Sequence, residues 1–421
     1  MRNTSWCRVD ERSVSRVTAL RRSKAVVQMR WFGFGFNAFG QICVQQELVK
    51  GEGRSEAAEE VKVINPTEVS DHVDRIRASW SRRASLHVDG DGCVCLAGSG
   101  TLDSNDCRGI STVESRGCED AFISESHLTL AFPDRIECWD LQKKEKTPSW
   151  SMEIKPQSEG SAVAFPLVPG GYITSKPPFY CPLSPHLKAK SLALGGEHVI
   201  LLTAAGAVYT WGLGSHGQLG HGGLTSEEEP RAVEALWGMQ MRSVASGGWH
   251  SVCISDGGDL YVWGWNESGQ LGLPSRGLMK ASQEKSSQLA GEFHQDVSTS
   301  PSKEPQEGEK HEEVFISIQA FPALLDVTPS CEIRTVSCGS RHTAAVTTTG
   351  DLYTWGWGEY GQLGHQTLTS SDEPQPVEFF RVEQMHVVDV VCGAWNTFAA
   401  VVKEEVASLK FPQNHSEKHA P

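Results

Sequence analysis

Short runs of apolar and β-branched residues alternate with glycine-containing turns along the second half of the chain. Three of these runs are VILLT at 199–203, SVCIS at 251–255 and AAVTT at 344–348. Each run is followed by a turn that contains glycine and by a second run, such as DLYVW at 259–263, that ends on an aromatic residue. This pattern predicts antiparallel strand pairs joined by tight turns, and therefore an all-β fold.

One phrase follows each of these predicted hairpins. It reads WGLGSHGQLG from Trp211, WGWNESGQLG from Trp263 and WGWGEYGQLG from Trp355. The first and second copies start 52 residues apart, and the second and third start 92 residues apart. The additional residues in the second interval match an insertion near 275–312. Units of about 50 residues with four short strands are typical of β-propeller blades, whereas solenoid units are shorter.

Weaker copies extend the array toward both ends of the chain. The stretch WFGFGFNAFGQI at 31–42 repeats the phrase, whereas VVCGAWNTFAAVV at 390–402 repeats only the residues that precede it. A ring whose last blade is completed by both chain ends produces this arrangement and removes exposed sheet edges. Six units are recognisable and 148–185 is a candidate for another. We therefore expect a single seven-bladed β-propeller, with six blades as the alternative.

The phrase contains GxGxxG, written by Gly212, Gly214 and Gly217, which is the fingerprint of a dinucleotide-binding loop. Such a loop would occur once, open a long helix and precede an acidic residue by about 20 positions. Here the phrase recurs and no helical periodicity follows it, so we assign its glycines to turns and close backbone contacts. The structural repeat residues predicted on this basis are Trp211, Trp263, Trp355, Gly212, Gly217, Gly264, Gly269, Gly356 and Gly361.

A histidine precedes the tryptophan of each clear phrase by 13 residues, namely His198, His250 and His342. Residues at one repeat position lie in different blades, so these three side chains cannot converge on one metal ion. We expect them to make structural hydrogen bonds instead. Asn396 takes this position in the last partial copy, and Ala84 takes it in the weak copy at 83–98. The loop histidines, which are open to contact with a partner, are His216, His221 and His365.

The residue just before the histidine position differs from copy to copy, although the neighbouring positions of the repeat do not. In chain order it is Glu197, Trp249, Arg341 and Trp395. Repeat equivalence puts these side chains in an arc on one face of the molecule. Tryptophan and arginine are residue types that anchor protein interfaces. Two interpretations stay open: the arc binds a partner, or both tryptophans pack between blades as wedges.

The formal net charge of −14 argues against a broad nucleic-acid-binding surface on the folded part. The charge is uneven, because residues 1–30 carry eight Lys or Arg against two acidic residues (8 − 2 = +6), which leaves −20 for the rest. Three roles are open for this basic arm: a nucleic-acid or nucleosome tether, a mitochondrial transit segment, or an optional extension before Met29. Direct DNA contact is expected only through the arm.

Three segments make up the predicted organisation: a disordered basic arm at 1–29, a β-propeller at 30–403 and a C-terminal tail at 404–421. The stretch 275–312 is rich in Ser, Glu, Gln and Lys and lacks hydrophobic periodicity. We expect it to be a disordered, low-complexity insertion in the propeller. No run approaches 18 apolar residues, so no membrane-spanning helix is expected.

The twelve cysteines include no CxxC pair, and no apolar segment typical of a secretory signal is found at the start of the sequence. Both observations favour a nuclear or cytosolic setting in which the cysteines stay reduced. The motifs GxSxG, HExxH and GxxxxGK[ST] are absent. We therefore expect no catalytic residue, no metal and no cofactor in this chain. Nucleotide exchange stays open, because it needs no covalent chemistry.

The repeat GxxHT…GxxYxWGxxxxGQLG resembles that of the regulator of chromosome condensation family, strongly over 191–273 and 333–402 and weakly over 31–140. The resemblance implies a seven-bladed β-propeller. Members of the family act in different ways. The founding member is an exchange factor for a small nuclear GTPase and docks on nucleosomes, whereas others are photoreceptors or ubiquitin-ligase modules.

The part of the family that this chain resembles most consists of chromatin-associated adaptors that partner a JmjC-type oxygenase. The resemblance thus implies a non-enzymatic adaptor in a nuclear complex that supports chromatin regulation and chromosome segregation, with histones or the nucleosome as further partners. The alternative is a guanine nucleotide exchange factor for a small nuclear GTPase, whose functional residues do not map onto the weak copies. The expected location is the nucleus, with the cytoplasm, and mitochondrial import of an arm-containing form, left open.

Overall fold

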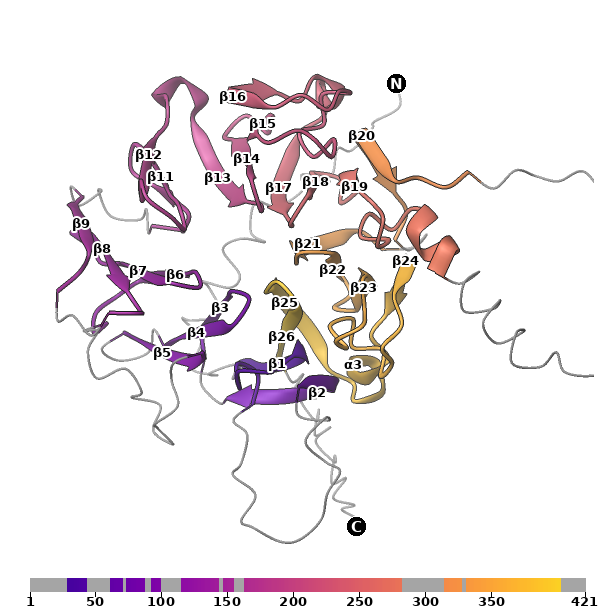
Figure 1. Ribbon diagram of the computed structural model, residues 1–421, viewed down its shortest axis with the longest axis horizontal. Coiled ribbons are helices and arrows are strands. Elements are labelled where there is room, and N and C mark those ends of the chain that lie inside the picture. The colour runs from indigo at the N-terminus through magenta and orange to yellow at the C-terminus, as the bar shows by residue number, and fades with distance from the viewer. Residues whose placement is uncertain are drawn as a thin grey trace, which may run out of the picture.

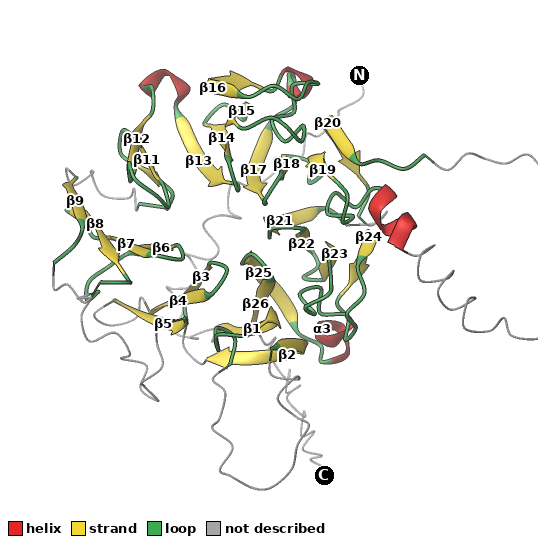
Figure 2. Ribbon diagram, viewed as in Figure 1, coloured by secondary structure: helices red, strands yellow, loops and turns green. Residues whose placement is uncertain are grey.

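Seven antiparallel sheets form a ring in the computed structural model of the chain (Figure 1). The structure describes residues 29–43, 61–70, 73–87, 92–99, 115–143, 147–154, 163–281, 314–327 and 331–402. Strands make up most of the regular structure, and the helices are few and short (Figure 2). The prediction of a seven-bladed β-propeller is confirmed, and the alternative of six blades is wrong.

Blade 1 closes the ring, because it takes strands from both ends of the chain. It has the order β2-β1-β26-β25. Strands β1 and β26 pair antiparallel, from Met29 opposite Val402 to Gly35 opposite Asn396, so the predicted closure is confirmed. The strands of this blade are β1 (Met29–Phe36), β2 (Lys62–Ser70), β25 (His386–Cys392) and β26 (Asn396–Val402).

The other six blades follow one another along the chain. Blade 2 consists of β3 (Arg75–Ala78), β4 (Arg82–His87) and β5 (Cys93–Gly98). Blade 3 consists of β6 (Asp120–Ile123), β7 (His127–Ala131), β8 (Arg135–Asp140) and β9 (Trp150–Glu153). Blade 4 consists of β10 (Leu167–Val168), β11 (Gly171–Ile173) and β12 (Tyr180–Pro182). This last blade lies in the segment that was the candidate for a further unit.

The three blades with the clear phrase each have four described strands. Blade 5 consists of β13 (Ala189–Leu194), β14 (His198–Thr203), β15 (Val208–Gly212) and β16 (Glu227–Ala232). Blade 6 consists of β17 (Met241–Ser246), β18 (His250–Ser255), β19 (Leu260–Trp265) and β20 (Ile318–Leu325). Blade 7 consists of β21 (Ile333–Cys338), β22 (His342–Thr347), β23 (Leu352–Gly356) and β24 (Ser371–Pro376). Short helices occur at η2 (Pro185–Leu187), η3 (Glu234–Leu236) and α3 (Glu378–Val382), and residues 276–281 form another.

The hydrophobic core is divided among the interfaces between neighbouring blades. Val252 and Val262 of blade 6, for example, share a buried cluster with Val336 and Trp355 of blade 7. Because each strand alternates its side chains between the two faces of its sheet, each blade packs on both neighbours. The fold is therefore stabilised all round the ring, and the ends of the strands are left to form its two faces.

The glycines of the phrase occupy backbone conformations that other residues adopt only with strain. Gly264 has a φ of 111° and Gly269 a φ of 75°. A Cβ atom at Gly264 would also lie 2.5 Å from the carbonyl oxygen of Trp249. Glycine is needed there both for the positive φ and for the close approach of two backbone segments.

The start of the predicted insertion belongs to the folded body, contrary to expectation. Ser275 is fully buried, and its N–H donates to Asp372 Oδ2 at 2.7 Å. Residues 276–281 form a helix. Residues 275–281 are therefore ordered, and Ser275 contacts blade 7. The polar composition of the segment did not indicate this contact. The rest of the insertion (282–312), residues 1–28 of the arm and the tail (404–421) lie outside the described residues.

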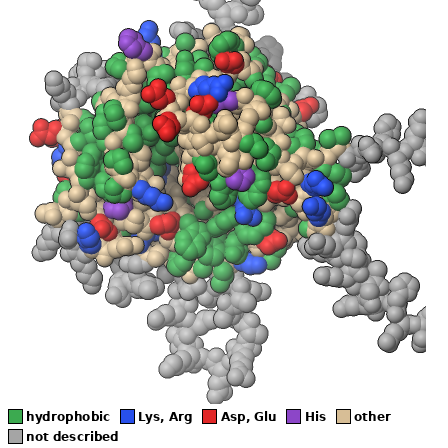
Figure 3. Space-filling model, turned by 45° about the horizontal axis from the view of Figure 1, so that its top comes forward, with side chains coloured by type: hydrophobic (Ala, Val, Ile, Leu, Met, Phe, Trp, Pro, Cys, Tyr) green, Lys and Arg blue, Asp and Glu red, His purple; other side chains and the backbone are tan. Residues whose placement is uncertain are grey.

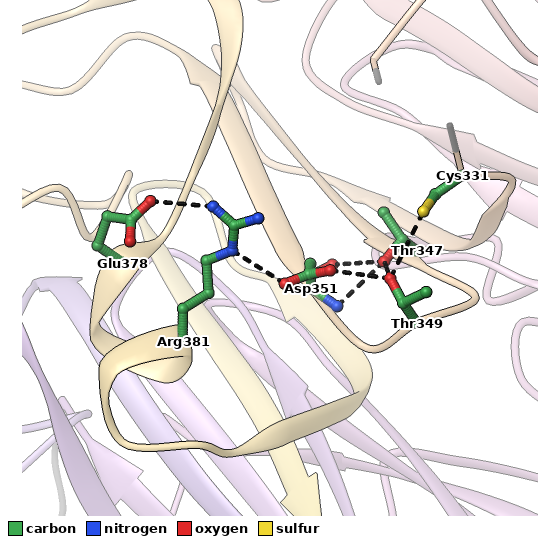
Figure 4. A network of polar contacts seen from close by, with 6 residues as sticks. All are labelled: Cys331, Thr347, Thr349, Asp351, Glu378 and Arg381. Atoms are coloured by element: carbon green, nitrogen blue, oxygen red, sulfur yellow. Dashed lines mark hydrogen bonds and ion pairs between the residues drawn. The ribbon is translucent and has the colours of Figure 1, made fainter. Parts of the chain in front are cut away.

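A surface network joins α3 to the hairpin turn of blade 7 (Figure 4). The guanidinium of Arg381 donates to Asp351 Oδ1 at 3.0 Å and to Glu378 Oε1 at 3.1 Å. Asp351 also accepts a hydrogen bond from Thr349 Oγ1 at 2.8 Å. These side chains are exposed, so the network contributes little to stability, on the order of 1 kcal/mol or less per pair.

Candidate protein-interaction face

Repeated backbone hydrogen bonds put the four predicted arc residues at equivalent positions in blades 5, 6, 7 and 1. Each of their carbonyl oxygens accepts from the N–H of the residue two places after the aromatic residue of the phrase. The four bonds are Leu213 to Glu197 (2.8 Å), Trp265 to Trp249 (2.9 Å), Trp357 to Arg341 (2.8 Å) and Phe36 to Trp395 (2.9 Å). The arc therefore exists as a geometric feature at one end of the propeller.

Blades 5, 6 and 7 bring one group of side chains together on this face. The guanidinium carbon of Arg341 lies 4.8 Å from the ring centroid of Trp265, a cation–π distance. The ring of Trp249 meets Trp265 edge-on, with centroids 5.4 Å apart. His216 completes the group, at 5.6 Å from Trp265 and 6.0 Å from Trp249. Two of the predicted residues, Trp249 and Arg341, are thus joined through a third that was not predicted.

Blades 7 and 1 form a second group beside the first. Trp395 and Trp357 have ring centroids 4.6 Å apart, and Tyr360 lies 5.1 Å from Trp357. Phe36 packs on Tyr360 at 5.0 Å. The ammonium of Lys62 lies 5.5 Å from the centroid of the Tyr360 ring. Aromatic pairs at these separations stabilise one another beyond the burial of their surface, so these rings support one another's positions.

Trp80 carries the aromatic surface on into blade 2. Its ring stacks parallel to Phe36, with centroids 6.2 Å apart, and meets Phe39 edge-on at 5.6 Å. The N–H of Trp80 donates to Glu125 Oε1 of blade 3 at 2.6 Å, which fixes the turn. Trp80 nevertheless has 44% of its surface exposed.

We call the ring side chains of the two groups, together with Arg341, Phe39 and Trp80, the aromatic belt. Its members share one face of the ring and are Phe36, Phe39, Trp80, His216, Trp249, Trp265, Arg341, Trp357, Tyr360 and Trp395. Figure 3 shows hydrophobic side chains gathered at the surface beside a central hollow, among acidic and basic ones.

The exposure of the tryptophans bears on the two interpretations of the arc. Trp263 and Trp355 are fully buried between blades, and their Nε1 atoms donate to the carbonyl oxygens of the phrase glutamines. Trp249 and Trp395 are only partly buried. This difference favours a surface role for the arc. Glu197 is exposed and is not among the ring contacts of the described residues.

Several belt residues were missed in the sequence. The second residue after the phrase tryptophan reads Leu213, Trp265 and Trp357, and Phe36 stands there in the weak copy. This position varies as the arc position does, and it could have been found by the same comparison. The residues missed were Phe36, Phe39, Trp80, Trp265, Trp357 and Tyr360.

The repeated histidines link neighbouring blades below the belt. Nε2 of His250 lies 3.0 Å from Thr343 Oγ1 of the next blade, and that hydroxyl donates to the carbonyl oxygen of Gln270 at 2.7 Å. The same relay joins His198 to Ser251 and Gln218, and His342 to Thr397 and Gln362. We call each relay a latch, because it ties the phrase of one blade to the second strand of the next.

The latch fixes the protonation of each histidine. A carbonyl oxygen can only accept, so the hydroxyl donates to it and must accept from the N–H of the ring at Nε2. Nδ1 is buried with no hydrogen-bond partner among the described residues, and is unprotonated. Burial accordingly lowers the pKa of His198 to about 4, and that of His250 and His342 to about 3.

The latches predict a loss of stability in mild acid. The pKa values of these histidines in the folded chain lie below the unfolded value of about 6.5, so the unfolded chain binds more protons in mild acid. The stability that they contribute is therefore fully present above pH 6.5 and falls as the pH drops toward 4. We expect each histidine to cost about 2 kcal/mol between pH 7.5 and pH 5. Urea unfolding at both pH values measures this loss. His250→Asn introduces the residue that blade 1 has at this position, and it should remove about a third of the pH-dependent loss of unfolding free energy. If the loss between the two pH values is the same in this variant as in the wild type, His250 is not a neutral buried histidine.

The histidine position has other occupants in the degenerate blades. Asn396 takes it in blade 1, as predicted, and its Nδ2 donates to the carbonyl oxygen of Phe36 at 3.3 Å. In blade 2 the prediction of Ala84 is wrong. Arg82 pairs with Gly98 as His198 pairs with Gly212, so the weak copy is shifted by two residues. His127 takes the equivalent place in blade 3.

The other two loop histidines bind their own blades. His221 Nε2 lies 3.0 Å from Thr210 Oγ1, and His365 Nε2 lies 2.8 Å from Thr354 Oγ1. Burial lowers the pKa of both imidazoles. Of the three loop histidines, only His216 contributes to the belt.

The described residues contain no group of three or more His, Cys, Asp or Glu side chains arranged to hold a metal ion. In the same part of the chain, no helix is long and apolar enough to cross a membrane.

Comparison with known proteins identifies the repeat. The model of the regulator of chromosome condensation (RCC1) repeat matches residues 205–254, 257–294 and 349–400. RCC1 domain-containing protein 1 from Homo sapiens is 43% identical over 390 residues, which cover 89% of this chain and 97% of that protein. The protein of the same name from Mus musculus is 41% identical over 398 residues, with the same coverage.

A solved structure has the same fold. The crystal structure of Prp20p from Saccharomyces cerevisiae, described with its binding properties to Gsp1p and histones, matches with a TM-score of 0.60. The match covers 90% of this chain and 92% of that one at 17% identity, so it shows the fold alone. The repeat, the closed ring and the full-length relatives together show that the chain belongs to the RCC1-repeat β-propeller family that includes RCC1 domain-containing protein 1.

Proposed function

We propose that this chain is a non-enzymatic scaffold that binds a protein partner through the aromatic belt. The observation that carries the proposal is the partly exposed group of Trp249, Trp265 and Arg341, preorganised by ring and cation–π contacts. Binding energy in protein interfaces is concentrated in such tryptophans and arginines. The net charge of −14 favours a protein over a nucleic acid as the main partner of the body.

We further propose that the scaffold acts in a nuclear, chromatin-associated complex whose other member is a JmjC-type oxygenase. Chromatin regulation and chromosome segregation are the processes it would support. This finer statement rests on the family resemblance alone, and the likeness to RCC1 domain-containing protein 1 supports membership of the family. Histones are a further proposed partner, since the Prp20p structure is described with binding to them. Any metal chemistry would then take place on the oxygenase.

Capture from nuclear extract tests this function. The full-length chain is immobilised, and the bound proteins are identified by mass spectrometry. We expect a JmjC-type oxygenase among them, and its binding should withstand moderate salt because the belt is aromatic. Capture of other proteins alone would contradict the named partner, while loss of all capture would contradict the scaffold itself.

Nucleotide exchange is the second candidate, because Prp20p, which has the same fold, is described with binding to Gsp1p. Mixing the chain with a small nuclear GTPase loaded with a fluorescent nucleotide separates the two functions. A scaffold leaves the release rate within about twofold of the intrinsic rate, whereas an exchange factor raises it by orders of magnitude. Accelerated release would overturn our preference.

A further inference from the structure

The outer strand of blade 6 exposes large apolar side chains. Ile318, Phe321 and Leu324 lie at intervals of three along β20 and are the exposed positions of this strand. Phe321 has 54% of its surface exposed and Leu324 has 61%. An outer strand of this kind attracts other chains unless polar residues protect it.

Strand register shows which residues three other blades have at the positions of Phe321 and Leu324. Gln319 pairs with Gly264 as Glu227 pairs with Gly212, Ser371 with Gly356 and Val63 with Gly35. In each outer strand a proline lies three residues after this paired residue, which confirms the alignment. The position of Phe321 is taken by Glu229, Glu373 and Asn65 in blades 5, 7 and 1, and that of Leu324 by Ala232, Pro376 and Glu68.

The loop after the phrase of blade 5 extends this apolar surface. The N–H of Gly222 donates to the carbonyl oxygen of Ala320 at 3.0 Å. A Cβ atom at Gly222 would lie 2.1 Å from the ring of Phe321, so the ring can pack against the backbone only because residue 222 is a glycine. Leu224 in this loop is exposed, and so is Trp237, which follows the η3 helix that packs beside β20.

We call Leu224, Trp237, Ile318, Phe321 and Leu324 the apolar strip. Acidic side chains flank it on the side of blade 5. Glu228 and Glu229 are exposed on β16, and Glu234 is exposed at the start of η3. A segment that covers the strip must therefore bring both apolar side chains and positive charge.

We propose that the strip is the docking site of the N-terminal arm of this same chain, residues 1–28. The arm has seven Lys or Arg against two acidic residues (7 − 2 = +5) and includes Trp6, Val14, Val17 and Leu20. It joins β1 at Met29, and 28 residues span up to about 90 Å when extended. The strip, two blades away, is within reach. Tethering keeps the arm at an effective concentration of about a millimolar, so even weak contacts are populated.

Zero-length cross-linking of the full-length chain tests the contact. A carbodiimide joins a lysine amine to a carboxylate only where the two touch, and Lys24 is the single lysine of the arm. We expect Lys24 to couple to Glu228, Glu229 or Glu234. The double variant Phe321→Ser with Leu324→Ser should lower the yield at least fivefold. The matched control Asn65→Ser changes the equivalent position on β2 and should leave the yield unchanged.

Two further measurements make the outcome decisive. All three proteins should melt within about 2 °C of one another because the changed side chains are exposed, so a lost cross-link would not reflect unfolding. Mixing isotope-labelled and unlabelled chains separates contacts within one chain from contacts between two. Equal yields in the wild type and the double variant, or coupling only between chains, would overturn the proposal.

Discussion

Replacing His250 with alanine is expected to lower the free energy of unfolding by about 2–4 kcal/mol. The imidazole is fully buried between blades 6 and 7, where its Nε2 donates to Thr343. Its removal leaves a void and takes away the donor for that hydroxyl. Because each blade packs on its neighbours, a loosened latch weakens the whole ring and not a single strand.

Urea unfolding at pH 7.5 measures the effect. His186→Ala is a suitable control, because this histidine is exposed in η2 and should change stability by less than about 0.5 kcal/mol. His250→Asn should fall between the two, since asparagine already fills this position in blade 1. A His250→Ala variant as stable as the control would show that the latch contributes nothing.

The repeated phrase was sufficient to predict the architecture. Trp211, Trp263 and Trp355 marked three blades, and the partial copies at the two chain ends indicated how the ring closes. Blade 4 was uncertain because its strands are only two or three residues long, too short to show a periodic pattern. Blade 2 was misaligned because Arg82 replaces the histidine that marks the register elsewhere.

The site was predicted less completely than the fold. Trp249, Arg341 and Trp395 stood out because they vary at a fixed repeat position. Trp265 and Trp357 were not singled out, although Trp265 is the ring on which Arg341 packs. The contact of Trp80 with Phe36 joins two blades whose repeats are degenerate, and no sequence spacing could indicate it.

The double variant Trp249→Ala with Arg341→Glu is expected to abolish partner binding while the fold persists. The truncation removes a ring from the centre of the belt, and the charge reversal removes the cation over Trp265. Interface tryptophans and arginines commonly contribute 2 kcal/mol or more each, so affinity should fall at least about 100-fold. Both side chains are partly exposed, so the melting temperature should change by no more than a few degrees.

Trp237→Ala provides the matched control, because Trp237 is 67% exposed and lies outside the belt. It should bind the partner with wild-type affinity. The direct test of the belt is affinity capture from nuclear extract with the wild type, the double variant and this control, together with the melting temperature of each. The belt account predicts that the double variant alone loses the partner and still melts like the wild type. Retained binding by the double variant, or a collapse in its stability, would contradict it.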